Sequence, residues 1–126
     1  MATFLWVGLG GAVGSMARYG VNVATHRWFR NDPQHATAIV NIVGCLVIGV
    51  LAGRLANGQL QLSAPWRAFI FVGVLGGFTT FSSLGLDTLT LVQSGRIGFA
   101  VSNLVIQLVI GLGAVFAGYA AAVSMK

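Results

Sequence analysis

Charged side chains are scarce in this sequence: of 126 residues, only 7% are Asp, Glu, Lys or Arg. A soluble domain has about 25% charged residues, so this chain lacks the polar surface that contact with water requires. Hydrophobic types reach 56%, which also excludes a disordered chain because disorder requires low hydrophobicity. The composition therefore indicates an integral membrane protein rather than an ordinary soluble enzyme or binding module.

Cysteine and acidic residues are the rarest of the chemically active types. The single cysteine, Cys45, excludes an intrachain disulfide and a metal site built from several cysteines. The acids are Asp32 and Asp87, and the seven Lys and Arg residues are spread along the chain rather than clustered as a nucleic-acid surface requires. Because the sequence also lacks a nucleophile–base pair and a phosphate-binding loop, we expect neither an enzyme nor a nucleic-acid partner.

Long apolar runs, in contrast, are abundant. A membrane-spanning helix needs about 20 mostly apolar residues, and the charges leave four such runs. They do not alternate in polarity as transmembrane strands do, so the predicted fold class is an all-α membrane protein, one domain over residues 1–126. The four transmembrane helices are expected at about 3–24, 36–56, 67–94 and 97–123.

Positive charge favours neither orientation of these helices. Orientation follows the Lys and Arg imbalance between the loops on the two sides, and here three residues oppose three. They are Arg54, Arg67 and Lys126 against Arg27, Arg30 and Arg96. One interpretation is a weak bias that the insertion machinery resolves. The other is dual topology, in which copies insert both ways and pair as an antiparallel homodimer, supplying the inverted halves that many transporters carry in one chain.

The third apolar run predicts an interrupted helix. As one continuous helix, its 28 residues from Arg67 to Ser94 would span about 42 Å, against about 30 Å of hydrocarbon. Its middle, Gly76-Gly77-Phe78-Thr79-Thr80, is rich in glycine and β-branched residues, which disfavour a regular helix. A break between Gly76 and Thr80 would shorten the continuous helix and would place these residues outside regular helical geometry. The carbonyls freed by the break could coordinate a cation. The alternative is a kinked helix whose Ser and Thr hydroxyls bond the main chain.

Polar residues within the apolar runs are candidates for function because they are costly in a bilayer. Asn41 lies early in the second run, and Asn103 and Gln107, four residues apart, share one face of the fourth. These amides either join neighbouring helices or line a water-filled path. Asp87 has two interpretations. It is a residue near a helix end that lies in a vestibule or pairs with Arg18, or it is a proton or cation site. A path of amides and hydroxyls with few charges suits a small ion or solute.

Three motifs together resemble the Fluc (CrcB-type) family of fluoride channels. They are Gly76-Gly77-Phe78-Thr79-Thr80-Phe81-Ser82-Ser83, Thr37-x-x-Val40-Asn41 followed by Gly44, and Gly10-Gly11-x-x-Gly14-x-x-x-Arg18-Tyr19. The resemblance extends over essentially the whole chain, including its length and helix count. It implies a channel that passively exports fluoride from the cytoplasm across the bacterial inner membrane and protects the cell from fluoride toxicity. It also implies an antiparallel, dual-topology homodimer in membrane lipid, with two pores.

The resemblance further implies roles for single residues. Asn41 would donate a hydrogen bond to the permeating ion, and Phe81 would offer its ring edge, which carries partial positive charge. The backbone carbonyls of Gly76 and Thr79, from both subunits, would hold a structural sodium ion at the dimer centre. Nearby hydroxyls would come from Thr80, Ser82 and Ser83, and Arg18 would lie towards a vestibule.

The sequence departs from the family's pattern at four positions. Leu84 stands in the ion pathway where the family usually has a second phenylalanine, and leucine has no ring edge to offer. Asp87 is the counterpart of a glutamate. Asn103 and Gln107 occupy positions of the fourth helix where the family often has serines, so both amides join the expected ion pathway.

Two other functions compete with the channel. A small dual-topology multidrug efflux transporter would need a membrane-embedded carboxylate in its first helix, where this chain has Arg18 and no acid. A non-transporting assembly subunit of the membrane would need neither a broken third helix nor Asn41.

Overall fold

The structure of the protein is a computed structural model that describes residues 2–29 and 34–125. All regular secondary structure in these two ranges is helical, which confirms the predicted class. The elements are α1 (Ala2–Trp28), α2 (Gln34–Ala56), α3 (Ala64–Arg67), the π-helical segment η1 (Ala68–Leu75), α4 (Gly76–Phe78), α5 (Phe81–Gln93) and α6 (Ile97–Ser124). Arg30, Asp32 and Lys126, which entered the charge analysis, lie outside the described residues.

Three helical segments among the described residues are long and apolar enough to cross a membrane. They are Gln34–Ala56, Ala64–Gln93 and Ile97–Ser124. With 27 residues, α1 has the length of a spanning helix, but Arg18 and several glycines lower its hydropathy. It is therefore the least apolar of the long helical segments.

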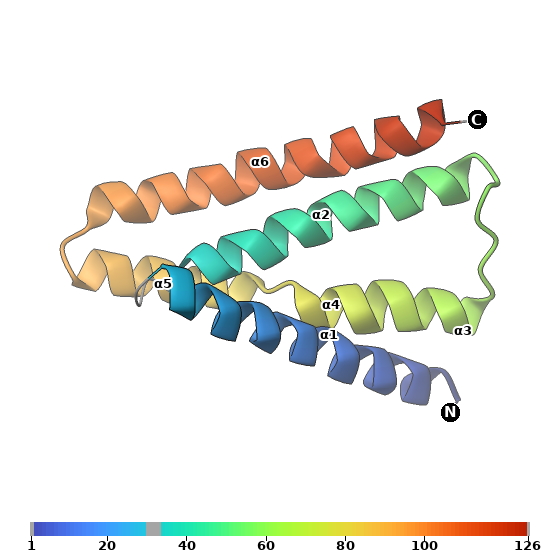
Figure 1. Ribbon diagram of the computed structural model, residues 1–126, viewed down its shortest axis with the longest axis horizontal. Coiled ribbons are helices and arrows are strands. Elements are labelled where there is room, and N and C mark those ends of the chain that lie inside the picture. Colours follow the sequence, from blue (N-terminus) through green and yellow to red (C-terminus); the bar gives the residue numbers. More distant parts are fainter. Residues whose placement is uncertain (1, 30–33, 126) are drawn as a thin grey trace.

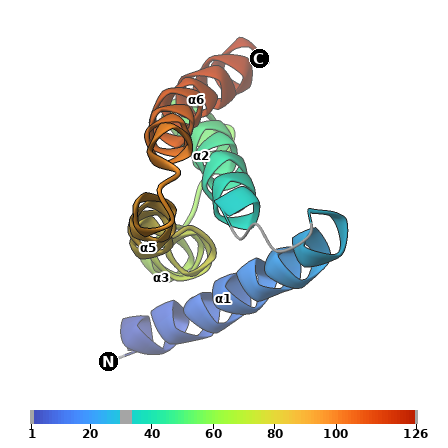
Figure 2. The same ribbon diagram turned by 90° about the vertical axis from the view of Figure 1, so that its left-hand side faces the viewer.

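The helices form an elongated bundle in which some helices run antiparallel to the others. Figure 1 shows α2 and α6 running side by side in the same direction, while α1 and the segment from α3 to α5 run the opposite way. Figure 2 shows that α1 crosses one side of the other helices. The turn between α5 and α6 contains Gly95, whose φ of 75° lies in the left-handed region that favours glycine. This turn makes α5 and α6 antiparallel neighbours.

Several glycines bring helix backbones into close contact, and Gly49 and Gly14 are two examples. Gly49 of α2 packs on α6, where an added Cβ would lie 2.9 Å from the carbonyl carbon of Val115. Gly14 of α1 packs on the third helical segment, where an added Cβ would overlap the Val74 carbonyl oxygen and lie 2.9 Å from the Phe78 nitrogen. In lipid, such close approach is a main source of helix–helix attraction. Glycine therefore fixes the position of α1 next to the residues that precede the helix break.

The segment that begins at Ala64 is interrupted at Thr79 and Thr80, within the range where the sequence predicted a break. The backbone there is extended, with φ −86° and ψ 159° at Thr79 and φ −157° and ψ 117° at Thr80. Thr80 caps α5, because its hydroxyl accepts a hydrogen bond of 3.1 Å from the Ser83 N–H. The Thr79 hydroxyl donates to the Leu75 carbonyl at 2.9 Å, so the back-bonding of the kinked-helix alternative also occurs, just before the break.

Candidate functional site

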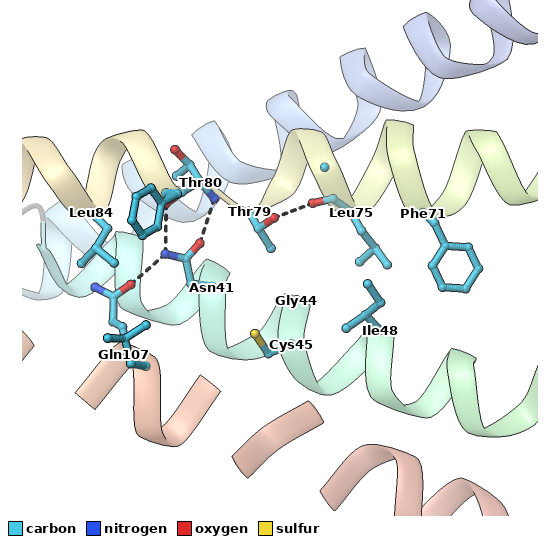
Figure 3. Close-up of a pocket in the computed structure, with 13 residues that line it drawn as sticks. Asn41, Gly44, Cys45, Ile48, Phe71, Leu75, Thr79, Thr80, Leu84 and Gln107 are labelled. Atoms are coloured by element: carbon cyan, nitrogen blue, oxygen red, sulfur yellow. Dashed lines mark hydrogen bonds between the residues drawn. The ribbon is translucent and has the colours of Figure 1, made fainter. Parts of the chain in front are cut away.

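Asn41 of α2 binds the main chain at the break. Its Oδ1 accepts a hydrogen bond from the Thr80 N–H at 2.8 Å, and its Nδ2 donates to the Thr80 carbonyl at 3.1 Å. The same Nδ2 donates to Gln107 Oε1 of α6 at 2.7 Å (Figure 3). An interrupted helix leaves main-chain groups without partners, and buried groups of this kind need one. Asn41 thus joins three helices, and both of its amide hydrogens are used within the chain.

The carbonyls of Gly76 and Thr79 lose the donors that a continuous helix would give them. In an α-helix the N–H of residue i donates to the carbonyl of residue i−4. In a continuous helix the Thr80 N–H would therefore donate to the Gly76 carbonyl, and the Ser83 N–H would donate to the Thr79 carbonyl. Here the Thr80 N–H donates to Asn41 Oδ1, and the Ser83 N–H donates to Thr80 Oγ1. The two carbonyls released are those that the sequence resemblance associates with sodium.

A cavity of about 340 Å³ lies beside the break. Its wall is mostly apolar and becomes polar at one end, where Asn41, Thr80 and Gln107 meet. Phe81 forms part of the wall with 78% of its surface exposed, whereas Leu84 is 3% exposed. The remaining lining residues are Gly44, Cys45, Ile48, Phe71, Leu75, Gly76, Thr79 and Leu108. Such a cavity can hold a small solute against a few donors at one end.

A second, much smaller pocket of about 20 Å³ lies on the other side of the break. Its polar lining residues are Arg18, Asn22, Thr37, Thr80 and Ser83. The Thr80 hydroxyl lies 3.1 Å from both the Ser82 and the Ser83 hydroxyl oxygens, so the three predicted hydroxyls form one cluster. The volume is that of a single water molecule or small ion, next to a permanent positive charge.

Asn103 and Gln107 are joined as their spacing suggested, with Gln107 Nε2 donating to Asn103 Oδ1 at 3.0 Å. Asp87 is buried in α5, and its carboxylate accepts a hydrogen bond from the Thr37 hydroxyl. Within the described residues, Asp87 Oδ2 and Asn103 Nδ2 are buried polar atoms without a hydrogen-bond partner. Arg18 borders the small pocket, whose lining does not include Asp87.

The structure brings together most of the predicted site residues at or beside the break. Asp87 is separate from both pockets described so far, and Asn103 borders another cavity towards the beginning of α6. Sequence reasoning missed Gly44, Cys45 and Ile48 as cavity residues, and Asn22 as a residue that lines the small pocket together with Arg18. Helical spacing was the available signal, because residues three, four and seven positions after Asn41 share its face, and Asn22 lies four after Arg18.

Known proteins resemble this chain along nearly its full length. Residues 5–119 match the family described as "CrcB-like protein, Camphor Resistance (CrcB)". A protein of Paracoccus denitrificans named fluoride-specific ion channel FluC is 49% identical over 116 residues, which cover 92% of this chain and 90% of that protein. A protein of the same name from Opitutus terrae is 40% identical over 127 residues, 100% of this chain and 96% of that protein. One from Rhodospirillum centenum is 42% identical over 120 residues, with coverages of 95% and 94%.

Proposed function

The chain belongs to the CrcB-like protein family, and from that premise we propose that it is a fluoride-specific ion channel. It is a multi-pass bacterial membrane protein and not an enzyme. It passively exports fluoride from the cytoplasm across the inner membrane and so protects the cell from fluoride. The observation that carries this function is the cluster of Asn41, Thr80 and Gln107 at the break of an apolar helix, in a chain whose relatives are named fluoride channels.

The ion pathway follows the cavity at the break. Phe81 directs a ring towards the path, and the positive edge of a phenyl ring attracts an anion. Amide and hydroxyl donors replace the water around fluoride; they come from Asn103 and Gln107 and from Thr80, Ser82 and Ser83. Asn41 holds this end of the path in place, because both of its amide hydrogens are used within the chain. Leu84 contributes only an apolar surface. Arg18 and Asp87 set the charge around the vestibule, where the guanidinium raises the local concentration of anions.

The functional unit is an antiparallel, dual-topology homodimer with two pores, in which α1 is the fourth membrane span. The balance of Lys and Arg between the two sides supports this assembly, because it favours neither orientation. The exposed ring of Phe81 supports it as well. A second subunit packed across the cavity would enclose a path that lipid would otherwise contact.

A structural sodium ion at the dimer centre would be held by the carbonyl oxygens of Gly76 and Thr79, two from each subunit. The donor set fits this ion, because both carbonyls have lost their helical N–H donors and carbonyl oxygens coordinate alkali cations in membrane proteins. When bound, sodium supplies positive charge between carbonyl dipoles that would otherwise repel one another across the interface.

The competing functions have less support. In a multidrug efflux transporter the first helix would carry a carboxylate, and Ala2–Trp28 contains none. An assembly subunit without transport would not explain why three helices converge on a polar break. It differs from the channel in one measurable property, which is fluoride flux.

Liposomes loaded with potassium fluoride test the channel directly. The purified protein, with a potassium ionophore to carry the balancing charge, is expected to release fluoride within seconds, and liposomes loaded with potassium chloride are expected to retain chloride. A fluoride electrode and a chloride electrode record the two fluxes, and protein-free liposomes give the leak. If folded protein produced no fluoride release above that leak, the channel would be ruled out in favour of the assembly role.

Phe81→Leu is expected to lower fluoride flux by about tenfold, because leucine keeps most of the apolar volume but has no positive ring edge. Since the ring is 78% exposed in a single chain, the fold of the subunit should be retained. The matched control is Phe116→Leu, which removes a ring of α6 that is 72% exposed and lies away from the cavity. Equal flux in Phe81→Leu and Phe116→Leu would exclude a specific role for the Phe81 ring.

A further inference from the structure

An aromatic cluster away from the helix break joins the beginning of α1 to the beginning of the third helical segment. The ring centroids of Trp6 and Trp66 lie 5.3 Å apart, and Phe69 meets both rings edge-on, at 6.0 and 5.6 Å. None of the three residues lines the cavity at the break or the small pocket beside it. The cluster therefore has no part in the proposed ion pathway, and Trp66 keeps 48% of its surface exposed.

The position of Trp6 along α1 places this cluster at a membrane surface. Trp6 and Trp28 are 22 residues apart in one continuous helix, a rise of about 33 Å, and the hydrocarbon core of a bilayer is about 30 Å thick. Tryptophan is enriched at both boundaries of that core, because its ring is apolar and its indole N–H is polar. Figure 1 shows the N-terminus, the C-terminus and the connection from α2 to α3 at the end of the bundle where α1 begins.

The cluster offers hydrogen-bond donors and positive charge, and no negative charge. Within residues 2–29 and 34–125, neither indole N–H of the cluster forms a hydrogen bond, and the exposed Arg67, which follows Trp66 in α3, forms no ion pair. The one acidic residue in those ranges is Asp87, which lies in α5 beyond the break. A guanidinium at a membrane surface attracts anionic lipids and can bind a phosphate through two N–H groups. The ligand that complements these donors is therefore a lipid phosphate.

We propose that Trp6, Trp66 and Arg67 form a binding site for the headgroup of an anionic phospholipid. Arg67 pairs with the phosphate, the indole N–H groups donate to oxygens of the headgroup, and the rings pack on the first part of the acyl chains. Phosphatidylcholine has the same phosphate, but its choline cancels the charge. The measurable consequence is a preference for phosphatidylglycerol over phosphatidylcholine next to the cluster.

Quenching of tryptophan fluorescence by brominated lipids tests this site. The protein has three tryptophans, and Trp28→Phe, a change at a residue that is 82% exposed, leaves only Trp6 and Trp66 as reporters. The variant is placed in liposomes of equal parts phosphatidylcholine and phosphatidylglycerol, in which one lipid or the other carries bromine on its acyl chains. We expect phosphatidylglycerol to be enriched about fivefold next to the reporters, because one arginine near the surface contributes about that factor.

Substitutions of arginine, made in the Trp28→Phe protein, separate a site from a general attraction. Arg67→Gln removes the charge and is expected to abolish the preference, whereas Arg67→Lys keeps the charge and should retain most of it. The matched control is Arg54→Gln, which removes an exposed arginine in the last turn of α2, at the same end of the bundle but outside the cluster. This control should keep the preference. Thermal unfolding of each variant shows that the fold is retained.

Two results would overturn the inference. The first is equal quenching by the two brominated lipids in the Trp28→Phe protein, which would mean that the cluster does not select an anionic lipid. The second is an equal loss of preference in Arg54→Gln and Arg67→Gln, which would indicate a diffuse attraction of the whole surface. Neither result depends on fluoride flux, so failure of the channel and failure of the lipid site are separate outcomes.

Discussion

Fluoride flux through the Asn41→Leu variant is expected to fall by about a hundredfold or more, and the variant is expected to unfold at a lower temperature than the wild type. Leucine is branched at the same carbon as asparagine and is larger, so the change removes polar contacts without leaving a cavity. The Thr80 N–H and carbonyl and Gln107 Oε1 would all lose their partner. Each unpaired buried group costs about 1–3 kcal/mol.

The matched control for Asn41 is Asn57→Leu. Asn57, just after α2, also joins segments far apart in the sequence, because its Nδ2 donates to the Ala122 carbonyl of α6 at 3.0 Å, but it lies away from the break and its cavity. We expect Asn57→Leu to lower the unfolding temperature slightly and to leave flux unchanged. Flux in liposomes and thermal unfolding in detergent measure the two effects. Wild-type flux in Asn41→Leu would mean that the break does not need a side chain to hold it open.

The position of the break was predictable because several local signals agree. Gly76, Gly77, Thr79 and Thr80 all disfavour a helix interior, and the length between Arg67 and Ser94 exceeds one membrane span. The π-helical turn over 68–75 has no comparable signal. Its residues are ordinary apolar helix residues, and the segment packs against α1, a contact between distant parts of the sequence that local preference does not predict.

The amide cluster was predictable only in part. The spacing of Asn103 and Gln107 placed them on one face, since residues four apart are neighbours on a helix. The bond from Asn41 to Gln107 joins residues 66 positions apart, a contact that no local pattern contains. Periodicity also does not say which end of an amide points where. That orientation is decided by the Thr80 backbone, and it changes the role of Asn41 from an open donor to one whose hydrogens are engaged.

Gly14→Ala is expected to destabilise the subunit by about 3 kcal/mol and to lower the yield of folded protein. The new methyl group would overlap the Val74 carbonyl oxygen and lie 2.9 Å from the Phe78 nitrogen. Both are main-chain atoms, so no side-chain rotation relieves the overlap, and α1 must move away from the third helical segment. Thermal unfolding in detergent, followed by tryptophan fluorescence, measures the loss.

The control, Gly8→Ala, is a change of the same chemistry with an expected effect of opposite sign. A Cβ at Gly8 meets nothing within 4 Å, and alanine in a helix is favoured over glycine by about 0.5–1 kcal/mol. Gly8→Ala should therefore unfold at an equal or higher temperature. Because Gly14 packs on residues just before Thr79, its displacement should also reduce flux in the protein that still folds. Equal unfolding temperatures for the two variants would show that α1 does not hold the break through this contact.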